Sequence, residues 1–343
     1  MSQMSPLHSP RADCEKAVSN WNETLARPRG WGVMIPSSQH GLRIGLDLGG
    51  SKIEGILMDS SATKLARYRI ATPRDDYAGT IAAIVDLASK LMQGITSETK
   101  VGIAVPGSIS PLTLLIQNAN STWLNGRPFV HDLQTALGMP VRLANDANCF
   151  ALSEATDGAA ENAHIVFGVI LGTGCGGGIV VDGRLLDGPR RIAGEWGHNP
   201  LPWAMPEEYP GPQCWCGRKG CLETWLSGPG MAADHARTTG ETLTAVEIAV
   251  RARQGNEPAR TTLSRHVDRL ARGLAQVVNI IDPDVIVLGG GLSQLPHLYE
   301  QLPPLISPHI FADRASVAIK PPKWGHASGV RGAAWLWDLP DRN

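Results

Sequence analysis

Three of the six cysteines lie within eight residues, as Cys214, Cys216 and Cys221. Glycines between them permit the turns that bring three thiols together. Zinc takes tetrahedral sulfur and nitrogen ligands and needs a fourth one. The nearest upstream histidine, His198, lies sixteen positions before Cys214. The segment therefore predicts a closed Cys₃His zinc site with a structural role, and a disulfide or free thiols are the alternatives.

Carboxylates that could act on a substrate stand at three places. Asn145 and Asp146 follow an expected short strand and open an expected helix. Asp146 could serve there as a general base. Asn or Asp at a helix start is more often the N-cap, so both interpretations stay open. Glu195 and Glu223 flank the cysteine segment, where they could hold hydroxyl groups or be solvated surface charges.

The chain contains two similar glycine loops, and the first of them, at residues 47–52, differs from a P-loop. Its Ser precedes its Lys, and the residues that follow alternate like a strand instead of opening a helix. A glycine hairpin can bring backbone N–H groups to phosphate oxygens, and a nearby carboxylate can act through hydrated Mg²⁺. An ordinary Gly-Gly turn is the alternative. The candidate residues are Asp47, Gly49, Gly50, Ser51 and Lys52.

The second loop contains G-x-G-x-x-G, but a strand and an Asp-Gly turn follow where a dinucleotide fold requires a helix. Two glycine hairpins, one at the start of each half, would grip a polyphosphate across a cleft. The candidate residues are Gly172, Thr173, Gly174, Gly176 and Gly177. A third glycine run, at Gly289 and Gly290, could lie against an adenine or ribose, or could only turn a strand into a helix.

Periodic segments supply the elements that position these residues. Strands are predicted over residues 43–48, 53–58, 64–70, 101–105, 141–143, 165–171, 178–181, 184–186 and 285–288. Helices are predicted over 76–93, 129–137, 145–156, 222–226, 243–253, 258–280 and 330–337. Both halves begin with strand, glycine turn and strand. This repeated order of elements predicts an α/β protein of two lobes, residues 41–143 and 144–329. The helix at 330–338 is expected to pack back on the first lobe. Residues 1–40 show no sustained periodicity, which predicts a poorly ordered arm with one short helix at 15–25.

Composition excludes several classes of protein. Among 343 residues, 43% are hydrophobic and 18% charged, and the formal net charge is −1. A nucleic-acid-binding protein usually has a basic excess, and no apolar run reaches the ~20 residues of a membrane span. The N-terminus lacks the apolar stretch of a signal peptide. We expect a cytoplasmic protein without nucleic-acid or membrane partners.

Taken together, these motifs resemble those of the ROK family of sugar kinases over about residues 42–338. The first glycine loop matches D-x-G-G-T-K with Ser51 for Thr, Asn145-Asp146 matches the family's N-D pair, and residues 195–198 match E-x-G-H. Within the family, residues 118–126 and 195–203 are most similar to bacterial fructokinases, also called manno(fructo)kinases. The resemblance implies an actin-like ATPase (ribonuclease H-like) fold with two lobes and a central cleft, and a homodimer.

The resemblance also implies an activity: ATP-dependent phosphorylation of D-fructose at O6, with some activity on mannose. ATP and Mg²⁺ would occupy the glycine loops, the zinc would be structural, and Asp146 would be the base. The residues that would hold the sugar are Gly107, Asn120, Asn145, Glu195, His198 and Glu223. An N-acetylglucosamine kinase or glucokinase is the alternative within the family. A sugar-sensing regulator without turnover is the alternative outside the kinases.

Overall fold

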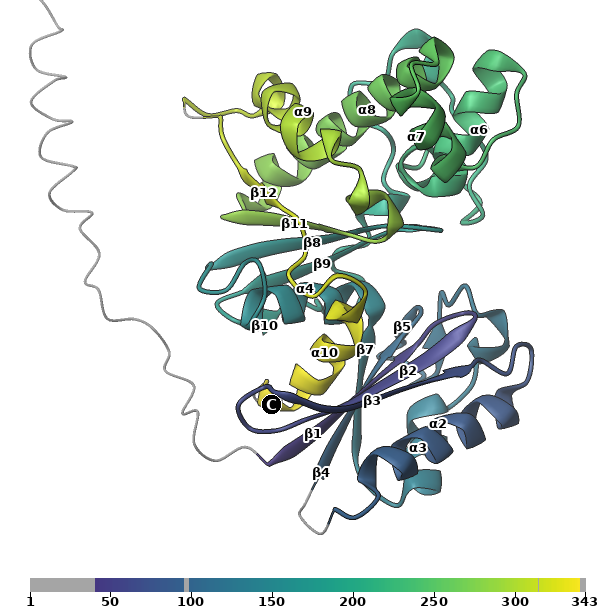
Figure 1. The fold of residues 1–343 in the computed structure, drawn as a ribbon, viewed down its shortest axis with the longest axis vertical. Helices are drawn as coiled ribbons and strands as arrows, with labels where there is room; N and C mark the ends of the chain where they lie inside the picture. The colour runs from purple at the N-terminus through teal and green to yellow at the C-terminus, as the bar shows by residue number, and fades with distance from the viewer. Residues whose placement is uncertain (1–40, 96–98, 314, 340–343) are drawn as a thin grey trace, which may run out of the picture. The chain divides into compact units, whose positions relative to one another are not determined.

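The computed structural model describes residues 41–95, 99–313 and 315–339, which belong to one compact unit. Two five-stranded sheets and their helices make up this unit (Figure 1). The predicted short helix at 15–25 lies outside the described residues. Among the helices that are described, none is both long enough and apolar enough to cross a lipid bilayer.

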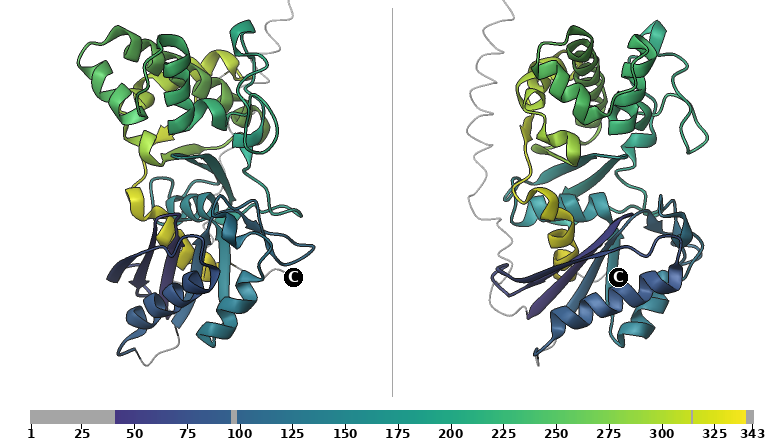
Figure 2. Two further views of the ribbon diagram at one scale, coloured as in Figure 1. Left: turned by 90° about the vertical axis from the view of Figure 1, so that its right-hand side faces the viewer. Right: turned by 45° about the vertical axis from the view of Figure 1, so that its right-hand side comes forward.

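The first sheet has the order β3-β2-β1-β4-β7. Strands β1 (Leu42–Leu48), β2 (Lys52–Met58) and β3 (Lys64–Ala71) form an antiparallel meander, and β4 (Thr99–Val105) and β7 (Val141–Asn145) run parallel to β1. Helices α2 (Tyr77–Met92) and α3 (Phe129–Leu137) cover the outer face (Figure 2). Their buried side chains, including Ile84 and Leu133, pack with those of the strands in one core.

The second sheet has the order β10-β9-β8-β11-β12. Its strands are β8 (Ile165–Leu171), β9 (Cys175–Val181), β10 (Arg184–Leu185), β11 (Val285–Gly289) and β12 (Ala318–Lys320). A glycine turn joins β8 to β9 in an antiparallel hairpin, as β1 joins β2. The remaining helices of this half follow the cysteine segment or flank β11: α5 (Glu223–Leu226), α6 (Gly228–Thr239), α7 (Ala245–Arg253), α8 (Glu257–Ile281) and α9 (His297–Ile306).

Helices α4 (Asp146–Thr156) and α10 (Ser328–Trp335) lie between the two sheets (Figures 1 and 2). Helix α4 packs on β8 and β9, whereas α10 packs on β1, β4 and α4. Gly332 of α10 permits this approach, because a side chain there would overlap the carbonyl group of Cys149 on α4. The C-terminal helix thus contacts the first sheet, and the predicted lobe boundaries stay predictions.

Several elements differ from the sequence prediction. Helices α6 and α9 were not predicted, because α6 opens with Gly-Pro-Gly and α9 contains Pro303 and Pro304, all of which usually mark turns. Short strands β5 (Ser108–Ile109), β6 (Ile116–Gln117) and β12 were missed as well. Strand β9 begins at Cys175, three residues before its predicted start, because pairing with β8 continues through the glycines.

A buried ion network holds the segment that precedes the cysteines. Glu208 follows Trp203 in this segment, and its Oε1 accepts from Arg269 Nε at 2.7 Å and Arg272 Nη2 at 2.8 Å. Arg272 also donates to the carbonyl group of Trp203 at 2.9 Å. Burial opposes ionisation of Glu208, yet hydrogen bonds from Arg272 and Arg269 lower its pKa to about 2. Helix α8, which carries both arginines, therefore anchors residues 202–208.

Replacing Glu208 tests this anchor. Glu208→Gln removes the carboxylate that Arg269 and Arg272 share and leaves each arginine one acidic partner, Asp234 or Asp268. We therefore expect the free energy of unfolding to fall by about 2 kcal/mol, as for the loss of hydrogen bonds to a charged group. Denaturant unfolding at pH 7 measures the loss. The control is Asp86→Asn, which breaks an exposed pair with Lys90 and should cost less than about 0.5 kcal/mol. Equal losses in the two variants would contradict an anchoring role.

Candidate active site and metal centre

Strand β7 continues into α4 at Asn145, with no intervening loop. The Asn145 Oδ1 caps the helix by accepting from Ala147 N at 2.9 Å and Asn148 N at 3.4 Å. Its Nδ2 donates to Gly107 O at 3.1 Å. The N-cap role that the sequence left open therefore belongs to Asn145. Asp146 is the first helical residue, and its Oδ1 accepts from Ala147 N at 2.8 Å.

Four predicted carboxylates are linked pairwise by electrostatic interactions. Burial raises the pKa of Asp146, against the opposing hydrogen bond from Ala147. Burial, followed by the negative charges of Asp146 and Glu54, raises the pKa of Asp47 to about 7. Burial also raises the pKa of Glu195; nearby His198 opposes this shift, and the charges of Asp146 and Glu223 add to it. The structure thus places Asp47 and Glu195 within electrostatic reach of Asp146, and Glu223 within reach of Glu195.

The predicted residues Gly107 and Asn120 belong to two neighbouring loops. Gly107 has φ +75°, and a side chain there would lie 2.4 Å from Gln117 O, so glycine is required. The exposed Asn120 follows Ala119, whose N–H and C=O both bond the Asn125 side chain at 2.9 Å. Sequence reasoning missed the bracing role of Asn125, since an Asn-Gly pair indicates only a turn.

The first glycine loop is a closed hairpin, as predicted. Gly49 N donates to Lys52 O at 3.0 Å. Thr72, which follows β3, donates through its hydroxyl to Gly49 O at 2.7 Å and through its N–H to Ser51 O at 3.1 Å. Gly50, Ser51 and Lys52 are exposed at the tip. No local pattern pointed to Thr72, because its role depends on the pairing of β2 with β3.

The second loop is shorter than predicted. Gly172 N donates to Gly174 O at 3.0 Å, and the exposed Thr173 lies between them. Gly176 and Gly177 pair with β8 inside β9, so the prediction that they form part of the loop was wrong. A side chain on Gly177 would lie 2.8 Å from Gly194 O and from the Trp196 ring, which explains why this buried position is glycine.

The third glycine run is explained by packing. Gly289 ends β11, and a side chain there would lie 2.5 Å from the Phe150 ring. Gly290 has φ +79° and lies against Leu171 O at the end of β8. A 3₁₀ turn, Gly291–Gln294, follows directly. The predicted contact of Gly289 and Gly290 with a nucleotide stays a prediction.

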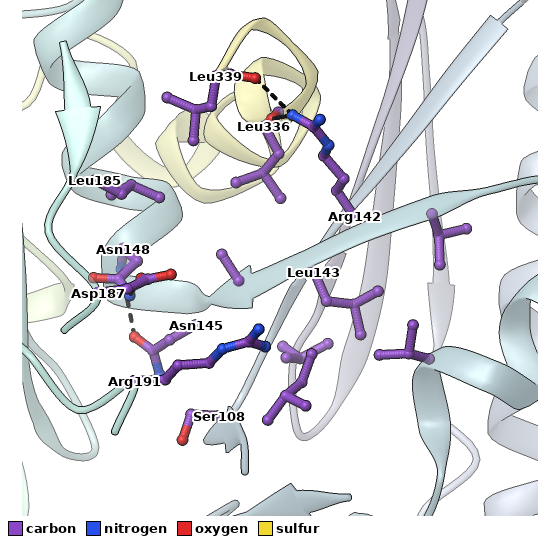
Figure 3. Close-up of a pocket in the computed structure, with 15 residues that line it drawn as sticks. Ser108, Arg142, Leu143, Asn145, Asn148, Leu185, Asp187, Arg191, Leu336 and Leu339 are labelled. Carbon is purple, nitrogen blue, oxygen red and sulfur yellow. Dashed lines mark hydrogen bonds between the residues drawn. The ribbon is translucent and has the colours of Figure 1, made fainter. Parts of the chain in front are cut away.

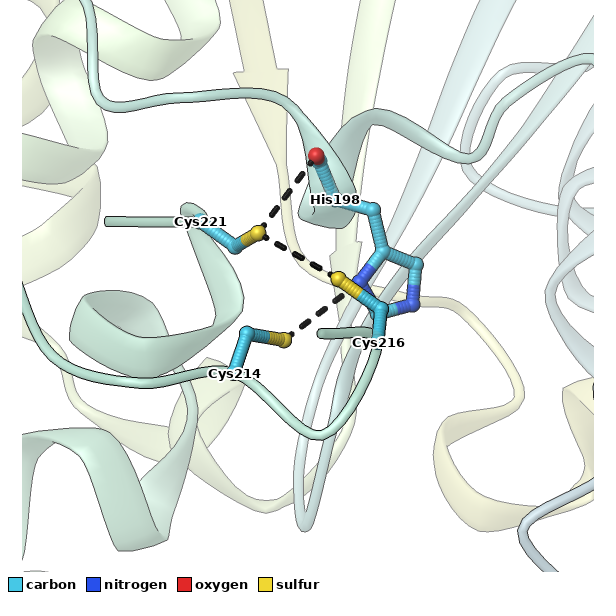
Figure 4. A group of neighbouring side chains, drawn as sticks. All are labelled: His198, Cys214, Cys216 and Cys221. Atoms are coloured by element: carbon cyan, nitrogen blue, oxygen red, sulfur yellow. Dashed lines mark hydrogen bonds between the residues drawn. The ribbon is translucent and has the colours of Figure 1, made fainter. Parts of the chain in front are cut away.

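The predicted zinc ligands meet in one cluster (Figure 4). The ligand atoms of His198, Cys214, Cys216 and Cys221 all lie within 4.8 Å of one another. Cys214 Sγ is 3.7 Å from His198 Nδ1, and Cys216 Sγ is 3.6 Å from Cys221 Sγ. Sulfur ligands of tetrahedral zinc are about 3.8 Å apart, given zinc–sulfur bonds of about 2.3 Å. The donor set and its spacing therefore fit zinc, whereas the described cysteines form no disulfide.

Glu223 connects the metal cluster with the second glycine loop. Its Oε2 accepts from Cys175 N at 3.0 Å, and its Oε1 accepts from Trp215 Nε1 at 2.6 Å. Trp215 lies between two of the cysteines and meets the His198 ring edge-on at 5.0 Å. From the sequence, Trp215 could pack around the cysteine loop or offer a stacking surface for sugar, and packing was the favoured interpretation. Its hydrogen bond to Glu223 carries no sequence signal.

A cavity of about 320 Å³ lies beside the N-terminus of α4 (Figure 3). Asn145 is the only predicted site residue in its lining. Polar groups of Asn148, Asp187 and Arg191 face it alongside apolar side chains of β7 and the C-terminal segment. This cavity is therefore a neighbour of the carboxylate group around Asp146 and does not contain it.

Comparisons with known proteins place the chain in a family. A model of the ROK family matches residues 43–339. The N-acetyl-D-glucosamine kinase of Haemophilus influenzae is 40% identical over 301 residues, which cover 85% of this chain and 98% of that protein. The crystal structure of a ROK hexokinase from Thermus thermophilus superposes with a TM-score of 0.76 at 29% identity, covering 85% of this chain and 96% of the other.

A second solved structure, a ROK family glucokinase from Streptomyces griseus in complex with glucose and AMPPNP, has a TM-score of 0.71 at 28% identity. It covers 86% of this chain and 99% of that one. These likenesses confirm the predicted two-lobed actin-like fold. The predicted nearer resemblance to fructokinases is not supported, because the 40% identical relative is named for N-acetyl-D-glucosamine. From the match across both sheets and the cysteine segment, it follows that the chain belongs to the ROK family.

Proposed function

We propose that this protein is an ATP-dependent kinase that phosphorylates N-acetyl-D-glucosamine. The observation that carries the proposal is the half-buried Asp146 at the start of α4, with the carboxylates of Asp47 and Glu195 within electrostatic reach. Relatives named N-acetyl-D-glucosamine kinase, at 40% identity, favour this substrate over fructose. These relatives support the alternative within the family better than the fructose that the resemblance suggested.

Asp146 would take the proton from the attacking sugar hydroxyl. Burial raises its pKa and so makes the carboxylate a better proton acceptor than an exposed one. Phosphoryl transfer needs little covalent chemistry from the protein, so positioning and charge stabilisation dominate. Asn145 supplies the positioning, because its side chain joins the start of α4 to Gly107.

The sugar would be held by polar groups on both sides of Asp146. We assign this role to Gly107, Asn120, Asn145, Glu195, His198 and Glu223. A matching sugar would form hydrogen bonds to these groups through its hydroxyl and amide groups. A poorly matched sugar would leave some of the protein groups unpaired, and this difference is a source of specificity.

The nucleotide would lie between the glycine hairpins. The exposed residues Gly50, Ser51, Lys52 and Thr173 lie at the hairpin tips, where phosphate oxygens can approach. Asp47 would hold the Mg²⁺ that comes with ATP, and this ion would supply positive charge to the phosphates. Burial raises the pKa of Asp47, and the positive charge of Lys52 opposes this rise. A bound cation would stabilise the ionised Asp47 carboxylate in the same way. The homodimer implied by the family resemblance stays a prediction.

Zinc in the Cys₃His cluster would be structural. Four protein ligands close a tetrahedral site and leave no open position for substrate. The cluster ties His198 to the cysteine loop, and His198 follows Glu195 by one helical turn. Metal binding would therefore fix the predicted sugar-binding residues, because the ligands are not assembled in the unfolded chain.

The base assignment is tested by Asp146→Asn. We expect kcat to fall roughly 10²–10⁴-fold, the usual contribution of a positioned proton acceptor. Folding should persist, because the helix cap is Asn145. Steady-state turnover at saturating sugar and MgATP, with thermal melting alongside, measures both effects. Asp182→Asn, at an exposed turn, is the matched control and should keep full turnover. Parent-like turnover in Asp146→Asn would exclude Asp146 as the base.

The substrate assignment is tested with a panel of sugars. ADP release should give a higher kcat/KM for N-acetylglucosamine than for fructose, mannose or glucose. A polar site built for one set of groups discriminates strongly against a sugar that leaves them unpaired. A preference for fructose would contradict this assignment and support the fructokinase predicted from the family resemblance. No turnover with any of the four would favour a sugar-binding regulator.

The metal assignment is tested by elemental analysis. The purified protein should contain one zinc per chain, and Cys216→Ser should reduce zinc content and melting temperature together, because metal binding is coupled to folding. Cys149→Ser is the control, since Cys149 is a buried thiol on α4 outside the cluster and its replacement should leave zinc content unchanged. A zinc-free parent protein of full stability would contradict the assignment.

A further inference from the structure

Trp215 occupies an unusual place in the metal loop. It is flanked by Cys214 and Cys216, so two of the four clustered ligand residues fix the backbone on either side of it. Its side chain is nevertheless 65% exposed. The ring meets the His198 ring edge-on, at 5.0 Å between centroids and 85° between planes. A large aromatic side chain is thus held rigidly at the surface beside two predicted sugar-binding residues.

The indole N–H of Trp215 is committed to one acceptor. Nε1 donates to Glu223 Oε1 at 2.6 Å, a short hydrogen bond to a carboxylate. Hydrogen bonds to ionised groups are stronger and more directional than neutral ones. The other oxygen of Glu223 accepts from Cys175 N at 3.0 Å, at the first residue of β9. The carboxylate is therefore clamped between the metal loop and the second glycine hairpin.

Space around the clamp is limited on one side. A side chain on Gly174 would lie 2.8 Å from Glu223 Oε2, so glycine at this hairpin position leaves room for the carboxylate. A carboxylate offers about four lone-pair sites, of which these two contacts use two. The remaining sites can accept from sugar hydroxyl groups, and their directions depend on how the clamp holds the carboxylate plane.

We propose that Trp215 is a positioning residue for sugar binding, which acts by orienting Glu223. The inference rests on the proposed function, since it deepens the sugar site assigned above. It predicts that Trp215 affects sugar affinity through its N–H group, and that it affects neither the metal cluster nor the nucleotide. The ring keeps its edge contact with His198 in a phenylalanine variant, so that variant isolates the hydrogen bond.

The test uses Trp215→Phe in the full-length zinc-loaded protein. The titrant is the sugar that the parent phosphorylates best among N-acetylglucosamine, fructose, mannose and glucose. Calorimetric titration should show its Kd raised roughly tenfold, as for loss of a hydrogen bond to a charged group. KM for that sugar should rise similarly, while kcat and KM for MgATP stay within about twofold, because Cys175 still holds Glu223 near the hairpin. Zinc content should stay at one per chain.

A double-mutant cycle separates positioning from direct contact. If Trp215 acts through Glu223, adding Trp215→Phe to Glu223→Ala, which removes the acceptor altogether, should raise Kd less than twofold further. The matched control is Trp203→Phe, because Trp203 is also exposed but its ring stacks on His309. Unchanged Kd in Trp215→Phe, or fully additive effects with Glu223→Ala, would overturn the inference.

The same measurements distinguish failure of this inference from failure of the proposed function. If the parent protein prefers another hexose, the substrate assignment changes, and the Trp215 test is carried out with that hexose. Parent protein that binds none of the four sugars would overturn both the proposed function and the role of Trp215. Loss of zinc in Trp215→Phe would assign the residue to the metal loop and contradict a positioning role.

Discussion

The hydrogen bonds of the Asn145 side chain are the constraint on which the candidate site depends. Asn145 pairs with Val105 in the first sheet, caps α4, and holds the Gly107 loop through its amide. Helix α4 in turn packs on β8 and β9 of the second sheet. One residue therefore fixes Asp146 relative to both sheets. An unsatisfied cap would cost about 1 kcal/mol in stability, and it would also release the residue on which the proposed chemistry rests.

Crowded carboxylates are the electrostatic counterpart of this geometry. Asp47, Asp146 and Glu195 all have raised pKa values, with burial as the leading cause in each. Such groups are costly to keep ionised without cations or hydroxyl donors nearby, and shifted pKa values of this kind gather at functional sites. The metal cluster and the clamp on Glu223 add rigidity on one side, whereas the Thr72 hydrogen bonds brace the first hairpin on the other.

Local patterns predicted much of this arrangement. Alternation and helical periodicity located α2, α3 and α8 and both glycine hairpins to within a few residues. Cysteine spacing and the nearest upstream histidine identified the four residues of the candidate metal cluster. Proline and glycine hid α6 and α9, because tertiary packing outweighs their local preferences there. The roles of Asn125, Thr72 and Trp215 were out of reach, since each depends on a hydrogen bond formed only after distant segments meet. The choice of sugar required comparison with relatives.

A crystal structure with N-acetylglucosamine and a non-hydrolysable ATP analogue tests the central claim most directly. The account predicts that the acceptor hydroxyl oxygen lies about 2.6–3.2 Å from an Asp146 carboxylate oxygen, with Asn145 still capping α4. It also predicts phosphate oxygens at the two glycine hairpins. A sugar bound in the cavity beside Asn148 and Arg191, with its hydroxyl groups out of reach of Asp146, would contradict the account.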